Sequence, residues 1–484
     1  MRRTKIVATL GPAVDKGDTL EKMIAAGVDV VRLNFSHGEH GEHRRRVEAV
    51  RAAAEKHKRD VGVLMDLQGP KIRIEGFRGG EVELSEGAEF TLDASRAADA
   101  GDEDGVGVTY RELPRDVAAG DTLVLGDGEI SLEVQEVEGP RVRCKVTAGG
   151  TLSDHKGLNR RGGGLSAQAL TEKDRRDIKL AAGLECDYLA VSFPRAASDV
   201  ERTRRLLREA GGKGAIIAKI ERSEAVDNLD AIILASDAVM VARGDLAVEI
   251  GDARLPGVQK RILRLAREHN TAVIVATQMM ESMVTSPVPT RAEVLDVANA
   301  VLDGTDAVML SEETAVGRHP VRVIETVARV CLGAEGEPTA DRTGAEGSRH
   351  FMRVDETIAM TAMYVARHLD LDALVALTES GMTALYMSRL STDIPVYALT
   401  PHETTRRRVT LYRGVYPVPF RADEESASGS QPRVGGDELH DAAAALYQRG
   451  AVGADALVLI THGKISGVAG GTNSLHLVRV GDLL

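Results

Sequence analysis

Long apolar segments are missing from this chain of 484 residues. No apolar run approaches the roughly 20 residues that a helix needs to cross a bilayer, so we expect neither a membrane span nor a membrane partner. The first residues, 1–4, lead into a short β-branched run without the apolar stretch of a secretory signal. We therefore expect a cytoplasmic protein.

Cysteine and net positive charge are scarce as well. The three cysteines, Cys144, Cys186 and Cys331, lack the spacing of metal or redox motifs, which fits a reducing compartment. A formal net charge of −12 disfavours nucleic acids and anionic membranes as partners, because both select for basic surfaces. What remains is a globular chain that is 43% hydrophobic and long enough for about two to four domains.

Short β-branched runs alternate with helical stretches along most of the chain. Eight of them span residues 6–10, 28–36, 61–67, 188–194, 215–221, 238–246, 272–280 and 307–315. Alternating strands and helices predict a parallel sheet, and eight units suggest a closed (β/α)8 TIM barrel. An open doubly wound sheet is the alternative. The barrel is favoured because polar residues gather at the C-terminal ends of the runs, where barrel enzymes keep their chemistry.

Two regions depart from this alternation. Residues 70–164 carry short alternating segments broken by Gly and Asp, which predict an inserted β-barrel lid domain over the mouth of the TIM barrel. A decorative insert is the alternative. After a Gly/Glu/Thr-rich linker at 333–348, a second α/β pattern begins, and within it the polar stretch 421–436 is typical of a surface loop. The expected domains are a barrel over 1–69 and 165–338, a lid over 70–164, and a C-terminal α/β effector and oligomerisation domain over 339–484.

Two neighbouring run ends carry one cation, two carboxylates and a glycine. Lys219 and Glu221 close one run, and Gly244 and Asp245 lie at the end of the next. Alternation along a strand sends Lys219 and Glu221 to the same face. The carboxylates suit Mg²⁺, and Lys219 is then free to neutralise charge on a transferring group. The pattern predicts a metal-assisted phosphate or enolate site, with a solvated salt bridge as the alternative for either motif alone.

Polar residues end most of the other runs too. They are Arg32, Asn34, Ser36, His37, Asp66, Thr277, Ser311 and Glu313. Helix capping explains any one of them, but it does not explain why nearly every run end is polar at once.

Six collinear motifs resemble the pyruvate kinase family. They are Arg-Leu-Asn-Phe-Ser-His-Gly at 32–38, Met-Asp-Leu-Gln-Gly-Pro-Lys-Ile-Arg at 65–73, Ala-Lys-Ile-Glu at 218–221, Val-Ala-Arg-Gly-Asp-Leu at 241–246, Ala-Thr-Gln-Met at 276–279 and Met-Leu-Ser at 309–311. The resemblance runs from Thr4 to nearly the end. It implies transfer of the phosphoryl group of phosphoenolpyruvate to ADP, giving pyruvate and ATP in the last step of glycolysis. It also implies Mg²⁺, with Mn²⁺ as an alternative, and a homotetramer.

The resemblance further implies a role for each matching residue. Glu221 and Asp245 would bind Mg²⁺, and Lys219 and Arg32 would lie at the phosphoryl group. The substrate carboxylate would meet Gly244, Asp245 and Thr277, and the proton path would involve Thr277, Ser311 and Glu313. The implied nucleotide-binding residues are Asn34, His37, Arg73 and Lys156.

Departures from the family pattern carry two further expectations. The family's K⁺ positions are matched here by Asn34, Ser36, Asp66 and the carbonyl of Leu67. Lys71, however, stands where the corresponding run of K⁺-using members has a glutamate. We therefore expect no K⁺ requirement. In the C-terminal domain Glu379 replaces a lysine common in bisphosphate-activated members. We therefore expect AMP or a sugar monophosphate as effector, near Thr378, Ser380 and Thr383. The sequence assigns no role to Arg160, Arg161 or Glu312.

Two other functions stay open at this point. One is a different Mg²⁺-dependent barrel enzyme of phosphoenolpyruvate or pyruvate, such as a class II aldolase, which has no need of a nucleotide lid. The other is a non-catalytic metabolite sensor, against which the complete set Lys219, Arg32, Glu221, Asp245 and Thr277 argues.

Overall fold

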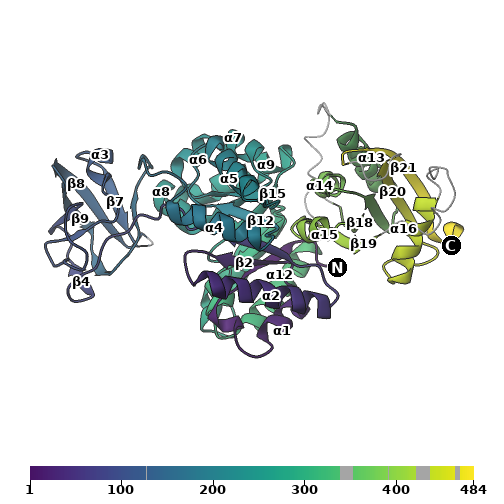
Figure 1. Ribbon diagram of the computed structural model, residues 1–484, viewed down its shortest axis with the longest axis horizontal. Coiled ribbons are helices and arrows are strands. Elements are labelled where there is room, and N and C mark those ends of the chain that lie inside the picture. The colour runs from purple at the N-terminus through teal and green to yellow at the C-terminus, as the bar shows by residue number, and fades with distance from the viewer. Residues whose placement is uncertain (127, 338–352, 391, 421–436, 464–468) are drawn as a thin grey trace.

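The computed structural model describes residues 1–484 except 127, 338–352, 391, 421–436 and 464–468. Most of the predicted linker at 333–348 and the predicted loop at 421–436 lie outside the described residues. Figure 1 shows three bodies in a row, with the β-rich insert at one end, the barrel in the middle and the C-terminal domain at the other end. No helix in the described part of the chain has both the length and the apolar character that crossing a membrane requires.

The central body is a closed barrel of eight parallel strands. Its strands are β1 (Lys5–Thr9), β2 (Val30–Asn34), β3 (Gly62–Asp66), β12 (Tyr188–Val191), β13 (Ala215–Ile220), β14 (Ala238–Ala242), β15 (Ala272–Ala276) and β16 (Ala307–Leu310). They close in the order β1-β16-β15-β14-β13-β12-β3-β2. The predicted (β/α)8 barrel is confirmed, and the open sheet is not.

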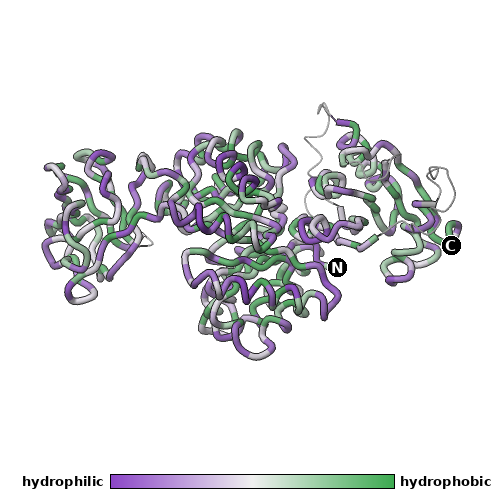
Figure 2. The backbone as a smooth tube through the Cα atoms, viewed as in Figure 1, coloured by the Kyte–Doolittle hydropathy of each residue, from purple (hydrophilic) through white to green (hydrophobic). Residues whose placement is uncertain are grey.

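The barrel strands are buried on both faces because helices surround them. The main outer helices are α1 (Thr19–Ala26), α2 (His40–Lys56), α4 (Glu172–Gly183), α5 (Ala197–Glu209), α7 (Leu229–Ala235), α9 (Leu255–Glu268), α10 (Arg291–Leu302) and α12 (Pro320–Glu335). Near-continuous apolar runs are what a parallel sheet of this kind requires. Figure 2 shows hydrophobic residues along the strands and hydrophilic ones along the outer helices.

Several strands end earlier than the sequence predicts. The run 238–246 was expected to be one strand, but β14 ends at Ala242 and helix α8 (Arg243–Ile250) begins at once. Likewise β16 ends at Leu310 and is followed by the short helix α11 (Glu312–Ala315). A short apolar run does not distinguish a buried strand from the buried face of a helix. Because β14 ends at Ala242, Asp245 lies in the first turn of α8 and not on a strand.

The insert is β-rich, as predicted, and packs around one apolar core. Its strands are β4 (Glu81–Leu84), β5 (Glu89–Asp93), β6 (Gly105–Gly107), β7 (Thr122–Leu125), β8 (Ile130–Glu138), β9 (Arg141–Ala148), β10 (Gly150–Ser153) and β11 (Leu158–Arg160), with helix α3 (Leu113–Asp116). Strands β4 and β10 pair separately from the other six, so the insert has two sheets and not one closed barrel. The chain leaves β9 through Gly149, where a β-carbon would lie 2.2 Å from the Leu84 carbonyl oxygen.

The C-terminal domain is a five-stranded sheet flanked by helices. Its elements are α13 (Val354–His368), β17 (Ala373–Leu377), α14 (Met382–Ser388), β18 (Val396–Thr400), α15 (Glu403–Val409), β19 (Val415–Pro419), α16 (Asp437–Gln448), β20 (Leu457–Gly463), β21 (Thr472–Arg479) and α17 (Val480–Leu483). The sheet order is β19-β18-β17-β20-β21, and β21 runs antiparallel to β20. Three of these elements, α15, β21 and α17, were not predicted.

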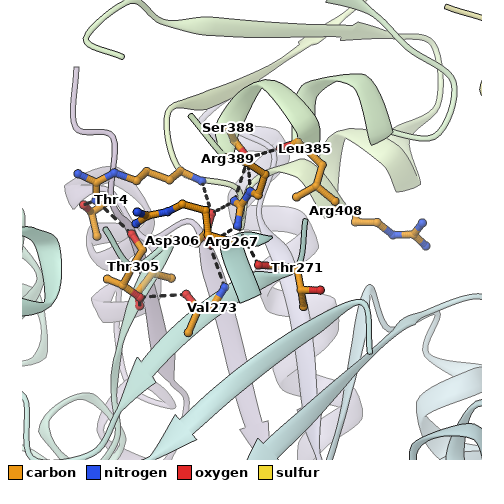
Figure 3. A network of polar contacts seen from close by, with 12 residues as sticks. Thr4, Arg267, Thr271, Val273, Thr305, Asp306, Leu385, Ser388, Arg389 and Arg408 are labelled. Atoms are coloured by element: carbon orange, nitrogen blue, oxygen red, sulfur yellow. Dashed lines mark hydrogen bonds and ion pairs between the residues drawn. The ribbon is translucent and has the colours of Figure 1, made fainter. Parts of the chain in front are cut away.

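A buried ion pair joins the C-terminal domain to the barrel. Arg389, at the end of α14, contacts both carboxylate oxygens of Asp306 and donates to the Thr271 carbonyl oxygen at 2.8 Å. Asp306 also accepts from the Val273 amide at 2.9 Å. Figure 3 shows Asp306 inside this network, between the two domains. Helix α14, which carries the predicted effector residue Thr383, is thus tied to the starts of β15 and β16.

Candidate active site

Lys219 lies at the tip of β13 among acidic groups. Its ammonium is 2.8 Å from Glu221 Oε1 and 3.5 Å from Asp66 Oδ1, and it donates to Ser192 Oγ at 2.8 Å. Burial lowers the pKa of Lys219, but Asp66 and Glu221 outweigh it, so the pKa is raised above its ordinary value. Lys219 is therefore a fixed cation, and the prediction that it shares a face with Glu221 is confirmed.

Asp66, which is fully buried, holds a second cation as well. The Arg32 guanidinium donates from Nε to Asp66 Oδ2 at 2.7 Å and from Nη1 to Thr9 Oγ1 at 3.0 Å. One carboxylate thus holds both Arg32 and Lys219.

Glu221 is suited to bind a cation. Its Oε2 accepts from the Phe193 amide at 2.8 Å, and its buried Oε1 lies 2.8 Å from the Lys219 ammonium. Burial, together with the nearby charge of Asp245, raises the pKa of Glu221 to about 7 against the opposing effect of Lys219.

No group of three His, Cys, Asp or Glu side chains that could hold a metal occurs in the described part of the chain. Two carboxylates suffice for Mg²⁺, which keeps water and substrate oxygens as its other ligands. Glu221 and Asp245 offer only hard carboxylate oxygens, and this donor set fits such an ion.

The loop after β15 holds Thr277 against helix α8. The Gly244 amide donates to Thr277 Oγ1 at 3.0 Å, and Arg243 Nη2 donates to the Thr277 carbonyl oxygen at 2.5 Å. Thr277 has φ 68°, which is rare for a β-branched residue, and strained backbone of this kind concentrates at functional sites. Thr277 and the start of α8, with Asp245, therefore form one rigid unit.

A further buried carboxylate, that of Glu313, lies in the short helix α11 that follows the eighth strand. Glu313 accepts from the Ser311 amide at 2.6 Å and from the Met280 amide at 3.2 Å. Burial raises the pKa of Glu313, and these hydrogen bonds oppose the rise. The neighbouring Glu312 is exposed in the first turn of α11, where a negative charge is favourable for the helix dipole.

The four residues expected at the nucleotide are spread over two domains. Asn34 Oδ1 accepts from the Ser36 amide at 3.0 Å at the tip of β2, and His37 follows on the surface. In the insert, Arg73 donates to the His155 carbonyl oxygen at 2.8 Å, next to half-buried Lys156. The structure does not bring these four residues together as it does Lys219, Arg32, Asp66 and Glu221.

Comparison with known protein families identifies the family of this chain. The family model described as "Pyruvate kinase, barrel domain" matches residues 1–324, and "Pyruvate kinase, alpha/beta domain" matches residues 356–478. The chain belongs to the pyruvate kinase family.

Similar full-length proteins agree. The chain is 51% identical to pyruvate kinase II of Salmonella typhimurium over 484 residues, which are 99% of each chain. It is 48% identical to pyruvate kinase of Haemophilus influenzae over 467 residues, 96% of each chain, and 42% identical to that of Mycobacterium tuberculosis over 484 residues, 99% of each chain.

The chain is therefore a phosphotransferase with the pyruvate kinase reaction, and the aldolase alternative is not supported. The family acts on phosphoenolpyruvate and ADP with a divalent metal ion. The contacts described above are made by the residues that the sequence predicted for this reaction.

The positions that match the family's K⁺ site are engaged within this protein. The Leu67 carbonyl oxygen accepts from Ser192 Oγ at 2.7 Å, and Asn34 and Asp66 have the partners given above. The ammonium of Lys71 lies 3.4 Å from Asp245 Oδ1. Lys71 thus places its charge beside a carboxylate predicted to bind metal, and it does not simply point into solvent.

The predicted effector loop is stabilised by its own contacts. Thr378 Oγ1 accepts from the Gly381 amide at 2.9 Å, and Thr383 Oγ1 lies 2.9 Å from Thr472 Oγ1. Glu379 Oε2 lies 2.5 Å from His402 Nε2. Half-buried Ser380 lies in the turn that precedes α14.

Sequence reasoning missed two side chains that shape this pyruvate kinase site. Ser192 contacts both Lys219 and the Leu67 carbonyl oxygen, and Thr9 accepts from Arg32. Both stand at the polar end of a predicted run, so the signal that selected Thr277 and Ser311 applied to them equally.

Proposed function

We propose that the cluster of Lys219, Arg32, Glu221 and Asp245 transfers the phosphoryl group of phosphoenolpyruvate to ADP, with Mg²⁺ or Mn²⁺ held by Glu221 and Asp245. One observation carries the proposal. Lys219 lies 2.8 Å from Glu221 Oε1, so a fixed cation and a carboxylate suited to a divalent ion meet at one point. When bound, the ion supplies charge that stabilises the oxygens of the transferring group.

The residues of the chain position the substrate and balance charge. Phosphoryl transfer leaves a protein mainly these two tasks. Lys219 and Arg32, both fixed by Asp66, face the phosphoryl oxygens. The amides of Gly244 and Asp245 lie in the first turn of helix α8, where the positive end of the helix dipole favours the substrate carboxylate. Thr277 holds that helix start in place.

The second half of the reaction needs a proton. Transfer of the phosphoryl group leaves the enolate of pyruvate, which accepts one proton at carbon. We propose that Thr277, Ser311 and Glu313 order the water chain that delivers it. Support comes from Glu313, whose burial and raised pKa favour the protonated form more than in an exposed glutamate.

The nucleotide belongs between the barrel and the insert. We propose that Asn34 and His37 meet its phosphates from the barrel, and that Arg73 and Lys156 meet them from the lid domain when it closes. We also retain the domain boundaries 1–69, 70–164, 165–338 and 339–484 as part of this proposal. Closure of the lid would exclude water, which would otherwise compete with ADP for the phosphoryl group.

Three further parts of the proposal concern conditions and assembly. The enzyme needs no K⁺ at Asn34, Ser36, Asp66 and Leu67, because Lys71 supplies a tethered charge next to Asp245. It works in the cytoplasm as a homotetramer. AMP or a sugar monophosphate, bound near Thr378, Ser380 and Thr383, activates it, because Glu379 repels a second phosphate.

Two experiments test these proposals. Pyruvate formation from phosphoenolpyruvate and ADP, coupled to lactate dehydrogenase, should require ADP and a divalent ion. A sensor would give no turnover. For the effector, titration of AMP, a sugar monophosphate and fructose 1,6-bisphosphate should show activation by one of the first two, and strong activation by the bisphosphate alone would refute the assignment.

A further inference from the structure

The chain leaves the lid domain through a segment that rests on the barrel beside the proposed metal site. After β11, residues Gly162, Gly163 and Gly164 have φ values of 85°, 78° and 94°, which favour glycine. A β-carbon on Gly163 would lie 2.7 Å from a carboxylate oxygen of Glu224. The backbone of this return segment therefore lies close against the Glu224 side chain of the barrel.

Three hydrogen bonds tie this return segment to the barrel. The Gly162 amide donates to the Glu249 carbonyl oxygen at 2.8 Å, and the Gly164 amide donates to Glu224 Oε1 at 2.7 Å. Arg222 Nη2 donates to the Leu165 carbonyl oxygen at 2.8 Å. The segment is thus held by one residue of α8, by Arg222 shortly after β13, and by Glu224 in the short helix α6 (Ser223–Asp227).

The same barrel residues are joined to one another. Glu249 Oε2 accepts from the Ser223 amide at 2.8 Å, and Glu249 Oε1 lies 3.7 Å from Arg222 Nε. Arg222 also pairs with Glu224 at 3.1 Å. Both Arg222 and Glu249 are buried, with 3% and 4% of their surface exposed. The loop after β13 and helix α8 are therefore fixed against each other.

These contacts adjoin the two proposed metal ligands. Arg222 follows Glu221 in the chain, and Glu249 lies one helical turn after Asp245 on the same helix. We infer that Arg222 and Glu249 are positioning residues: they set the separation of Glu221 and Asp245 and connect it to the position of the lid. This inference rests on the proposed metal site.

A purely structural ion pair would behave differently. It would change the stability of the fold, but it would leave metal affinity unchanged in any variant that still folds. Residues that orient metal ligands typically change metal affinity or activity by about 10- to 100-fold when they are replaced. Metal affinity in the absence of substrate therefore separates the two roles.

The test uses the full chain and Mn²⁺, whose free fraction is read by electron paramagnetic resonance. Glu249→Ala should bind Mn²⁺ about 10- to 100-fold more weakly than wild type. Glu249→Gln should recover much of the affinity, because its amide oxygen still accepts from Ser223. Glu209→Ala, on the exposed face of α5, is the matched control and should bind as wild type does.

Hydrogen exchange supplies the lid readout. In wild type, Mn²⁺ should slow exchange of the amides at 162–164, and in Glu249→Ala it should not. If Glu249→Ala fails to fold, Glu224→Ala tests the same connection and should also lose the effect of Mn²⁺ on these amides.

The outcomes distinguish this inference from the proposal beneath it. Wild type that does not bind Mn²⁺ would contradict the proposed metal site itself. The coupling alone would be overturned if wild type binds Mn²⁺ and a folded Glu249→Ala binds it with the same affinity. It would also be overturned if Mn²⁺ slows exchange at residues 162–164 equally in wild type and in Glu249→Ala.

Discussion

Replacing Lys219 with methionine removes one charge and little volume from the centre of the site. The lost ammonium lies 2.8 Å from Glu221 Oε1 and 3.5 Å from Asp66 Oδ1. Removing one preorganised contact to a developing charge costs about 3–4 kcal/mol. We therefore expect kcat for phosphoryl transfer to fall by about two to three orders of magnitude.

The same change has a cost for folding that the contacts make specific. Breaking a buried ion pair typically costs about 3–5 kcal/mol. Asp66 keeps Arg32 as its partner at 2.7 Å, so the loss falls mainly on Glu221. A divalent cation would compensate Glu221, and we expect Mg²⁺ to raise the Tm of Lys219→Met more than that of wild type.

The assay is pyruvate formation from phosphoenolpyruvate and ADP at saturating Mg²⁺, with Tm measured in parallel with and without Mg²⁺. Lys260→Met is the matched control, since Lys260 is an exposed lysine on α9 that pairs with Asp303, and its kcat should equal that of wild type. If folded Lys219→Met keeps kcat within about tenfold of wild type, a loss below about 1.4 kcal/mol, Lys219 does not act on the transferring group.

Three other predictions follow from particular charges. Wild-type turnover should persist when tetramethylammonium replaces K⁺, and Lys71→Glu should create a K⁺ requirement; a loss above about a hundredfold in wild type, roughly 3 kcal/mol, would falsify this. Arg389→Met leaves Asp306 buried without its cation, so urea unfolding should show a loss of about 3–5 kcal/mol; a change below about 1 kcal/mol would mean that the pair does not stabilise the fold. Burial lowers the pKa of Lys5 from 10.5 to about 8. Between pH 8 and pH 10.5 the unfolded state therefore binds more protons than the folded state, and the free energy of unfolding should rise with pH by up to about 3 kcal/mol. Lys5→Met should lack this rise, and equal pH dependence of the two proteins in denaturant titrations would rule out the shift.

The barrel and the centre of its site could be predicted because both depend on local patterns. Each strand is a short β-branched run, and alternation alone places Lys219 and Glu221 on one face. The ends of the elements were harder to predict. The run 238–246 was predicted to be one strand, yet residues 243–246 form the first turn of helix α8. The period of so short a run does not distinguish a buried strand from a helix with one buried face.

Contacts between distant segments could not be predicted from a single sequence. The contacts of Asp66 with both Arg32 and Lys219 depend on the register of β3 with β2 and, through β12, with β13, which the sequence does not specify. Arg160 and Arg161 stood out as departures without a role. The structure shows that Arg160 pairs with Asp121 at 2.8 Å within the insert, beside the three glycines that contact the barrel.

The central claim is that Glu221 and Asp245 hold a divalent cation beside Lys219 and that phosphoryl transfer depends on it. The most direct test is a Mg²⁺ titration of pyruvate formation from phosphoenolpyruvate and ADP by wild type and by Glu221→Gln. Wild type should saturate with Mg²⁺ and stop when the ion is chelated. Glu221→Gln should require at least about 10- to 100-fold more Mg²⁺ or lose turnover by a comparable factor. Full wild-type turnover after chelation, or an unchanged Mg²⁺ dependence in Glu221→Gln, would contradict the claim.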